Sequence, residues 1–266
     1  MDFLVTGDRS IFFYLLLFFL AAGVLQALSL GALFFLKRSG DSRANAAYGL
    51  LLIGFGLTLL HNILNFIGLY EAYPGLKFLP LYYTLSFPVL LFFHAKLSLY
   101  PAYKLRWTDA KHLLLPVGQL LFFTLLFLQP ADYKAGVSRA FYNPFYGALE
   151  QGLYLVSFFA YLYFAHRYVR ARRREARRLH QQQELRKALY LRTLLRVLLV
   201  LFTIHTVFVL TDFVYYEFLE INLRSVKPYV ALGMLSFAVL GYWMGTYGFQ
   251  VLFWGRYVFG GKQQEQ

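Results

Sequence analysis

The sequence predicts an all-α integral membrane protein, a bundle of seven transmembrane helices with its N-terminus outside and its C-terminus in the cytoplasm. Of its 266 residues, 59% are hydrophobic and only 15% are charged, whereas soluble domains are about 45–50% apolar and about 25% charged. Seven apolar segments reach the roughly 20 residues that a helix needs to cross a bilayer. Lys and Arg are concentrated in alternate connections between these segments, which sets the orientation.

Each predicted span is an apolar run bounded by charged or turn-forming residues. The first is preceded by Asp2 and Asp8, and its apolar core is too long for a cleavable signal, so we expect it to be retained. The later boundaries are KRSGDSRAN, YPG, YPAYK, QPADYK, RYVRARRRE and EFLEINLRSVKP. The predicted spans are 10–36, 46–70, 79–100, 112–129, 147–169, 193–219 and 228–253. They form one domain, 1–255, and residues 256–266 are expected to be a short cytoplasmic tail.

The basic residues indicate both orientation and location. Of the 26 Lys and Arg residues, 19 lie in or beside the connections after the first, third and fifth spans or in the tail, and 6 lie on the opposite side. The positive side of a membrane protein is cytoplasmic. The net charge of +13 therefore indicates contact with anionic lipid, and we expect a multi-pass protein of the cell (inner) membrane.

A group of polar side chains is expected in the outer half of the bundle. Ionisable residues inside spans are costly and usually functional. We expect a pocket open to the exterior that binds a small ligand or ion, formed by His61, Asn62, Asn65, Glu150, His205, Asp212 and Glu217. Interhelical hydrogen bonding is the alternative for the two asparagines. A lone carboxylate such as Asp212 needs a cavity or a partner, and His205, two turns earlier on the same face, is the expected partner.

A second polar group is expected near the inner surface. His94 and Lys96 lie at the inner end of the third span, Asp109 lies in the following turn, and His112 begins the next span. We expect these four residues to form an inner polar latch, in which Asp109 pairs with Lys96 and fixes the packing of the third and fourth spans. The alternative is that Lys96 extends along its alkyl chain to the lipid headgroups.

Small residues in the second and seventh spans predict close helix contacts. Gly54 and Gly56 lie in the second span; Gly241 and Gly245 have GxxxG spacing in the seventh, with Gly248 one turn further on. Such spacing lets two helix backbones approach each other. We expect packing within the bundle, and a homodimer contact is the alternative.

The connection at 167–196 is strongly basic and rich in helix-forming residues, without Gly or Pro. We expect the fifth and sixth spans to continue as helices that meet near HQQQE. The basic side chains would contact anionic lipid headgroups, and docking of an acidic cytoplasmic protein is the alternative. Nucleic acid binding by this chain is not expected, because no aromatic residues for base stacking are interleaved there.

Two segments resemble a bacterial family. The first runs from Pro88 through Leu90, Leu91, Phe92, Phe93 and Lys96 to WTDAKHLLLP, and the second is SFAVLGYWMGTYGFQ. Both are similar to the seven-span N-terminal membrane sensor region of membrane-anchored AraC-type (helix-turn-helix) transcriptional regulators. The resemblance implies a signal-receiving membrane module. In that family a DNA-binding domain follows the last span; here the chain ends thirteen residues after Phe253, so we expect a free-standing or truncated sensor region without that domain.

The predicted function is therefore a membrane-embedded sensor or receptor-like module, not an enzyme, which binds an unknown external ligand and signals to a cytoplasmic partner. A small proton- or ion-coupled transporter is the alternative, and an intramembrane metal-dependent hydrolase is disfavoured. His61, His94, His205 and Asp212 have zinc-ligand chemistry, but His94 is expected too far towards the inner side. The chain has no cysteine, P-loop, nucleophile elbow or HExxH motif. No catalytic residue, metal or cofactor is expected.

Overall fold

The computed structural model describes residues 11–36 and 42–259, with side chains as far as Phe253, and within these ranges it contains helices and turns but no strand. The long helices are α1 (Ile11–Leu36), α2 (Ser42–Phe66), α4 (Phe87–Leu99), α5 (Leu114–Phe127), α7 (Ala148–Arg178), α8 (Gln182–Phe218) and α9 (Lys227–Phe259). The short elements are α3 (Leu69–Ala72), η1 (Pro74–Leu76), η2 (Thr84–Ser86), η3 (Trp107–Leu113), α6 (Ala131–Gly136) and η4 (Leu223–Ser225). The all-α prediction is confirmed.

Five of the described helical segments are long and apolar enough to cross a bilayer, which indicates a multi-pass membrane protein. They are Ile11–Leu36, Ser42–Phe66, Trp107–Phe127, Gln182–Phe218 and Lys227–Phe253. The other two predicted spans, 79–100 and 147–169, are not among these five segments. The first contains only a shorter apolar helical segment, Thr84–Leu99. The second lies in α7, where Glu150, Gln151 and several tyrosines interrupt the apolar run.

Several predicted boundaries are corrected by the structure. Residues 79–83 are not helical, and Pro88 lies in the first turn of α4. Proline suits that position because the first helical N–H groups have no partner inside the helix. The second predicted span ends at Phe66 instead of residue 70. Helix α9 continues to Phe259, into the predicted tail, and residues 260–266 of that tail lie outside the described ranges.

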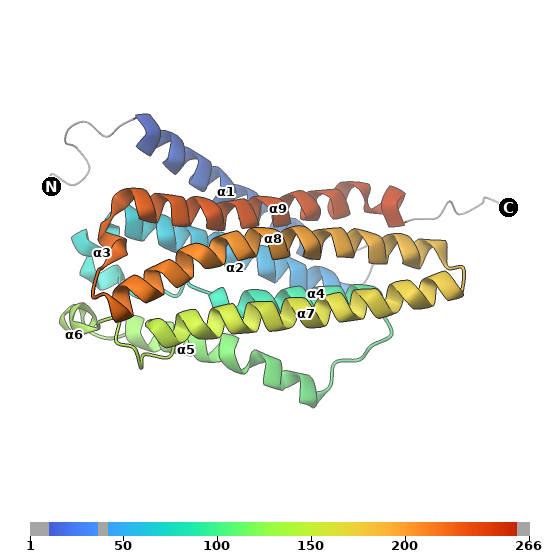
Figure 1. Cartoon of the computed structure of the whole chain (residues 1–266), viewed down its shortest axis with the longest axis horizontal. Helices are drawn as coiled ribbons and strands as arrows, with labels where there is room; N and C mark the ends of the chain where they lie inside the picture. Colours follow the sequence, from blue (N-terminus) through green and yellow to red (C-terminus); the bar gives the residue numbers. More distant parts are fainter. Residues whose placement is uncertain (1–10, 37–41, 260–266) are drawn as a thin grey trace.

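The helical extension of the basic connection is confirmed. Helix α7 has 31 residues and α8 has 37, and the chain reverses direction between them in residues 179–181. His180 takes the left-handed conformation there, with φ of 51°. We call this end of the bundle the basic end. The opposite end, which carries α3, α6 and η4, is the loop end (Figure 1).

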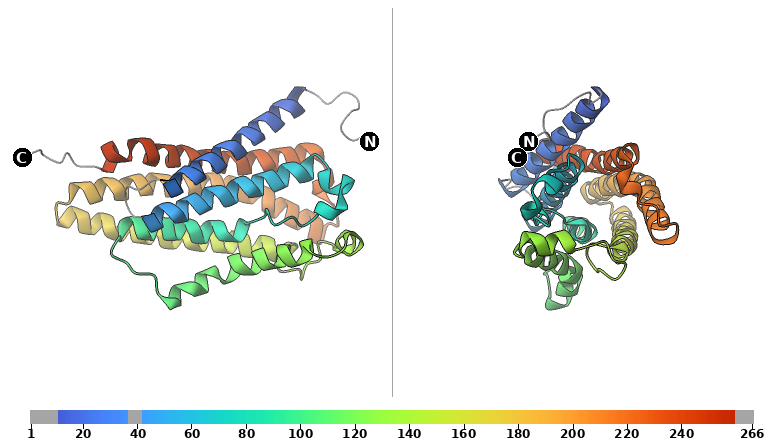
Figure 2. Two further views of the ribbon diagram at one scale, coloured as in Figure 1. Left: turned by 180° about the vertical axis from the view of Figure 1, so that it is seen from behind. Right: turned by 90° about the vertical axis from the view of Figure 1, so that its left-hand side faces the viewer.

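The long helices run antiparallel along one axis (Figures 1 and 2). Helices α1, α2, α4, α7, α8 and α9 form a ring in which each contacts the next, and α9 returns to α1. Helix α2 also contacts α9 across the ring. Helix α5 is peripheral, with η2 and η3 as its main contacts, and Figure 2 shows it splayed from the bundle at the end nearer the basic end.

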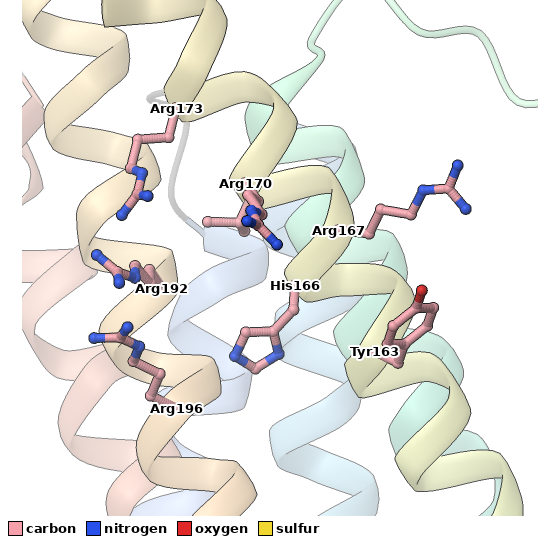
Figure 3. A pocket seen from close by; sticks show the side chains of 8 residues that line it. Tyr163, His166, Arg167, Arg170, Arg173, Arg192 and Arg196 are labelled. Carbon is pink, nitrogen blue, oxygen red and sulfur yellow. The ribbon is translucent and has the colours of Figure 1, made fainter.

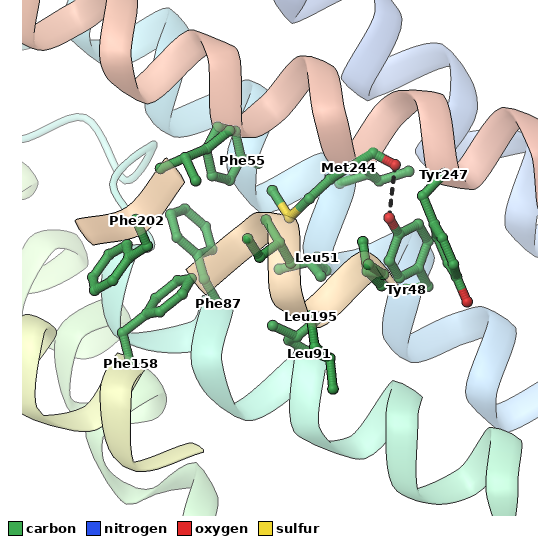
Figure 4. Packing of buried hydrophobic residues seen from close by; sticks show 14 of the residues in the cluster. Tyr48, Leu51, Phe55, Phe87, Leu91, Phe158, Leu195, Phe202, Met244 and Tyr247 are labelled. Carbon is green, nitrogen blue, oxygen red and sulfur yellow. Dashed lines mark hydrogen bonds between the residues drawn. The ribbon is translucent and has the colours of Figure 1, made fainter. Parts of the chain in front are cut away.

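The short helix α4 lies inside the protein. Eleven of its 13 residues are buried, because α2 and α7 cover it on two sides and α8 also reaches it. Its Phe87 ring lies 4.9 Å from the Phe55 ring of α2, and Figure 4 shows Phe87 beside the stacked pair Phe158 and Phe202, whose ring centroids are 3.7 Å apart. A helix enclosed by other helices does not need to match the bilayer thickness by itself, which accounts for its length.

The glycines of α9 make contacts within the bundle, so the packing prediction is confirmed for them. A Cβ atom at Gly241 would lie 2.8 Å from the Phe55 ring of α2, and one at Gly245 would lie 2.7 Å from the Gln26 side chain of α1. A Cβ atom at Gly248 would lie 3.1 Å from the rings of both Phe34 and Tyr48. A contact between two backbones, which the sequence analysis missed, joins α1 to α2: a Cβ at Gly31 would be 2.9 Å from the carbonyl oxygen of Gly49.

Two lysines close the loop end of the bundle. The Lys134 ammonium is buried and donates hydrogen bonds to the carbonyl oxygens of Gly75 (2.6 Å) and Phe127 (3.1 Å). Lys77 donates in return to the carbonyl oxygens of Lys134 (2.9 Å) and Val137 (3.2 Å). Partial burial lowers the pKa of Lys77. These bonds fix α6 to η1 and so hold in place the segment that follows α6.

Candidate functional site

Asp212, on α8, is the centre of the most highly connected polar cluster at the loop end. Its residue is only 6% exposed. Its Oδ2 atom accepts hydrogen bonds from Arg139 Nη2 at 2.9 Å, from Gln151 Nε2 at 2.8 Å and from Arg224 Nη2 at 3.1 Å, with Arg224 Nε at 3.2 Å. We call these four residues the Asp212 cluster. The expected need of this carboxylate for a partner is met by two arginines and an amide.

The two arginines reach Asp212 from connections outside the long helices. Arg139 lies between α6 and α7, and its guanidinium stacks over the Tyr216 ring at 4.3 Å from the centroid. Arg224 lies in η4, between α8 and α9, and its side chain is 45% exposed. Burial lowers the pKa of Arg139, the neighbouring positive charge of Arg224 lowers it further, and Asp212 opposes both effects. The cluster therefore holds two cations that repel each other around one carboxylate.

Several buried polar atoms of this cluster have no hydrogen-bond partner in the described part of the protein. They include two donors, Arg139 Nε and Nη1, and two acceptors, Asp212 Oδ1 and Gln151 Oε1. The hydroxyl of Tyr154, about one turn further along α7 from Gln151, is also buried and has no hydrogen-bond partner among the described residues. Buried polar groups in proteins are nearly always hydrogen-bonded, to protein or to ordered water. The cluster thus combines unused donors and unused acceptors in one place.

Glu150 belongs to a neighbouring chain of hydrogen bonds. Thr84 Oγ1 donates to Glu150 Oε1 at 2.7 Å, Gln119 Nε2 donates to Thr84 Oγ1 at 3.0 Å, and the backbone N–H of Leu85 donates to Gln119 Oε1 at 3.0 Å. All of these side chains are buried. This chain connects α7 to η2 and to the peripheral α5. The charges of Arg139 and Arg224 also act on Glu150, so it shares the electrostatic environment of the Asp212 cluster.

The polar residues of α2 have separate surroundings. His61 Nδ1 shares a hydrogen bond of 3.0 Å with the Tyr70 hydroxyl, and its ring lies 5.3 Å from that of Tyr82. Arg224 acts on His61 electrostatically, so the two sites are near enough to influence each other. Asn62 is partly buried and Asn65 is exposed. No side-chain contact of either asparagine to the Asp212 cluster is found among the described residues.

His205 does not partner Asp212, in contrast to the expectation. Its Nδ1 atom lies 2.9 Å from Ser236 Oγ on α9, and the Ser236 hydroxyl already donates to the Gly233 carbonyl oxygen at 2.7 Å. A hydroxyl has one proton to donate, so Nδ1 of His205 carries the proton in this bond. Two turns of helix separate the residues, but the ring of His205 faces α9 while the carboxylate of Asp212 faces α7. Glu217 is partly buried and forms no ion pair among the described residues.

The expected inner pair is present at the basic side of the bundle. Lys96 Nζ lies 3.6 Å from Asp109 Oδ1 and 3.6 Å from the centroid of the Tyr103 ring. Asp109 also accepts hydrogen bonds from the Tyr103 hydroxyl (2.8 Å) and the Arg106 backbone N–H (2.8 Å). Lys96 is buried among these protein groups. Whether this pair acts as a latch stays a prediction.

The two histidines of the predicted latch bond to other helices. His112 Nδ1 shares a hydrogen bond of 2.7 Å with the Tyr161 hydroxyl of α7. His94 donates from Nδ1 to the Ala44 carbonyl oxygen at 2.9 Å, and its Nε2 lies 3.4 Å from the Tyr247 hydroxyl. The carbonyl can only accept, which fixes the direction of the first bond. His94 therefore joins α4 to α2 and α9 and lies apart from the Lys96–Asp109 pair.

No group of three or more His, Asp or Glu side chains that could hold a metal ion occurs in the described ranges. His61, His94 and His205 each bond to a different neighbour, as given above, and their rings do not face a common point. The partners Arg139 and Arg224 were not among the expected site residues. The signal that was available is the buried carboxylate itself, because such a group requires a cation nearby.

Comparison with known proteins adds no relationship: no protein family, curated protein or solved structure matches this chain.

Proposed function

We propose that this chain is a membrane-embedded, receptor-like module of the bacterial inner membrane that binds a small carboxylate-bearing ligand at the Asp212 cluster and signals to a cytoplasmic protein. The observation that carries the proposal is the set of unused hydrogen-bonding atoms around Asp212. Two arginines face one carboxylate there, and guanidinium groups bind carboxylates in a bidentate manner. An anionic ligand therefore suits the site better than a cation.

Arg224 is the group through which a ligand would act. It is the more exposed of the two arginines, and its bonds to Asp212 are the longest in the cluster, at 3.1 and 3.2 Å. A ligand carboxylate would compete with Asp212 for Arg224 while using the unused donors of Arg139. Such exchange would change how η4 is held against α8. A ligand shifts a conformational equilibrium only by binding the two states unequally, and this competition supplies the difference.

Two continuous helices connect the cluster with the basic end. Gln151 is near the start of α7 and Asp212 near the end of α8, and both helices reach the basic hairpin without interruption. A 31-residue helix is about 45 Å long. A small rotation or shift at the loop end would therefore move the basic end as well. In the proposed orientation, with seven crossings and the N-terminus outside, the basic end meets the cytoplasmic partner.

A binding experiment tests this proposal. Purified protein would be heated in detergent with acetate, succinate, glutamate or citrate, and at least one anion is expected to raise the melting temperature. Arg224→Gln should abolish the shift, whereas Lys227→Gln, which removes a cation from the same end, should retain it. Stabilisation that is equal in the wild type and Arg224→Gln would refute the site.

Flux measurements separate the receptor from the transporter, which remains the second candidate on the sequence evidence. The stabilising anion is expected to bind without crossing the membrane of proteoliposomes. Uptake that disappears in Asp212→Asn would favour the transporter instead. The resemblance to the sensor region of AraC-type regulators favours the receptor-like module.

A further inference from the structure

A basic groove on the surface of the α7–α8 pair has no counterpart in the function proposed above. It has a volume of about 400 Å³ and is lined by five arginines, His166, Tyr163 and Val169. Figure 3 shows Arg173 from α7 facing Arg192 and Arg196 from α8, with the His166 ring between the two helices; Arg167 points away. The groove is thus enclosed by guanidinium groups from both helices.

The carboxylates that α7 and α8 carry beside this groove do not compensate its positive charge. Only two carboxylates, Glu175 and Glu184, occur between residues 151 and 211. Glu175 pairs with Arg172 at 2.8 Å, and Glu184 bridges Arg172 (3.3 Å) and Lys187 (3.2 Å). None of these residues lines the groove.

Like charges therefore face one another inside the groove. The positive charges of Arg173, Arg196 and Arg177 act on Arg192. The Nε of Arg173 is buried and has no hydrogen-bond partner among the described residues. An anion in the groove would reduce the repulsion between these arginines and accept a hydrogen bond from Arg173 Nε.

The position of the groove along the helices indicates which anion it holds. On the side towards the loop end, the exposed residues are apolar, such as Phe164 on α7 and Val200 on α8. On the other side, both helices carry the basic sequence of the hairpin. The groove therefore lies where the lipid-facing surface changes to a water-facing one, which is the depth of the phosphate layer of a bilayer.

We propose that the groove between α7 and α8 binds the phosphate of an anionic phospholipid of the membrane leaflet at the basic end. Arg170, Arg173, Arg192 and Arg196 bind the phosphate oxygens, since guanidinium and phosphate form paired, charge-assisted hydrogen bonds. The acyl chains follow the exposed apolar surface past Phe164 and Val200. This proposal is independent of the ligand at the Asp212 cluster and requires only that the protein lies in a membrane.

Lipid binding with matched variants tests the proposal. Protein in a neutral detergent would be titrated with dioctanoyl phosphatidylglycerol, dioctanoyl phosphatidylcholine and inorganic phosphate. The wild type is expected to bind phosphatidylglycerol. Arg192→Gln/Arg196→Gln should weaken this binding about thirtyfold, because each basic residue at an anionic lipid surface contributes roughly a factor of five. Arg192→Lys/Arg196→Lys, which keeps the charge, should lose less.

The control removes the same charge from the same hairpin. Arg174 and Arg186 are exposed and do not line the groove, so Arg174→Gln/Arg186→Gln should stay within about threefold of the wild type. Equal weakening of both double variants would show diffuse attraction to the hairpin and overturn the proposal. Binding of inorganic phosphate as tight as that of phosphatidylglycerol, or no preference over phosphatidylcholine, would overturn it too. Removing like charges should not unfold the protein, which melting curves of each variant would verify.

Discussion

At the scale of single residues, the buried carboxylate of Asp212 is the most informative group in the chain. Asp212→Asn keeps the shape but removes the charge that holds Arg139, whose side chain is mostly buried. Leaving one member of a buried ion pair without its partner costs about 3 kcal/mol or more. We expect this loss in the free energy of unfolding, measured by chemical denaturation in detergent.

Glu217 provides the control for that prediction. It lies five residues further along α8 and forms no ion pair among the described residues. Glu217→Gln should change the unfolding free energy by no more than about 0.5 kcal/mol, as for most surface substitutions. A cost for Asp212→Asn as small as that for Glu217→Gln would show that the Asp212 contacts contribute little to stability.

The pair of Lys96 and Asp109 leads to a prediction about coupling. Lys96→Met and Asp109→Asn each remove one charge, and the double variant removes both. Because the two groups are 3.6 Å apart and mostly buried, the double variant should be less destabilised than the sum of the single variants, by about 1 kcal/mol. Additive effects would instead show that Asp109 acts only through Tyr103 and the Arg106 backbone.

The sequence predicted some site residues better than others, and the reason is physical. The pairing of Lys96 with Asp109 could be predicted because a short turn separates them. The cluster around Asp212 could not be completed, because Arg139 precedes it by 73 residues and lies in a connection that no helical periodicity places. His205 shares a helix face with Asp212 only on an ideal helical wheel, whereas the direction of each side chain depends on the neighbouring helix.

At the scale of helices, close backbone contact determines how α1 meets α2. In Gly31→Ala the new methyl group would lie 2.7 Å from Ile53 Cγ1 and 2.9 Å from the Gly49 carbonyl oxygen. Overpacking of this kind costs about 1–3 kcal/mol, so the melting temperature should fall. Gly152→Ala, where a Cβ meets nothing within 4 Å, should leave it unchanged or raise it, since alanine favours a helix. A rise for both variants would contradict the observed contact.

The helices themselves could largely be predicted, since charged and turn-forming residues bound most apolar runs. The exceptions are α4 and α7. Residues 79–83 are apolar and aromatic and suit a span by composition, but they form an irregular segment that leads into η2, where the backbone N–H of Tyr83 bonds to the Thr58 hydroxyl at 2.9 Å. Helix α7 continues through the basic sequence to Arg178, because arginine favours a helix. Composition predicts that a segment is buried or exposed, but not whether lipid or protein surrounds it.

At the scale of the whole molecule, the ring of helices explains how a short buried helix and five lipid-compatible helices coexist. Helix α4 is buried against α2, α7 and α8, whereas α5 lies outside the ring, and the segment Trp107–Phe127 that contains it is the least buried of the five candidate spans. The loop end carries Asp212 with its two arginines, and the basic end carries the arginine-lined groove. Charged groups are therefore placed at both ends, and the middle of the bundle is occupied by aromatic packing.

The number of membrane crossings determines on which side of the membrane two connections lie. If 79–100 and 147–169 both cross, residue 102 is cytoplasmic and residue 136 is external; if only the five apolar segments of the structure cross, the two positions exchange sides. Because the chain has no cysteine, Ala102→Cys and Gly136→Cys can each be labelled with a membrane-impermeant thiol reagent in intact cells. Seven crossings predict labelling of position 136 only. Gln181→Cys, internal in both arrangements, and Ser225→Cys, external in both, are the controls. Labelling of position 102 without permeabilisation would refute seven crossings and place the Lys96–Asp109 pair on the external side.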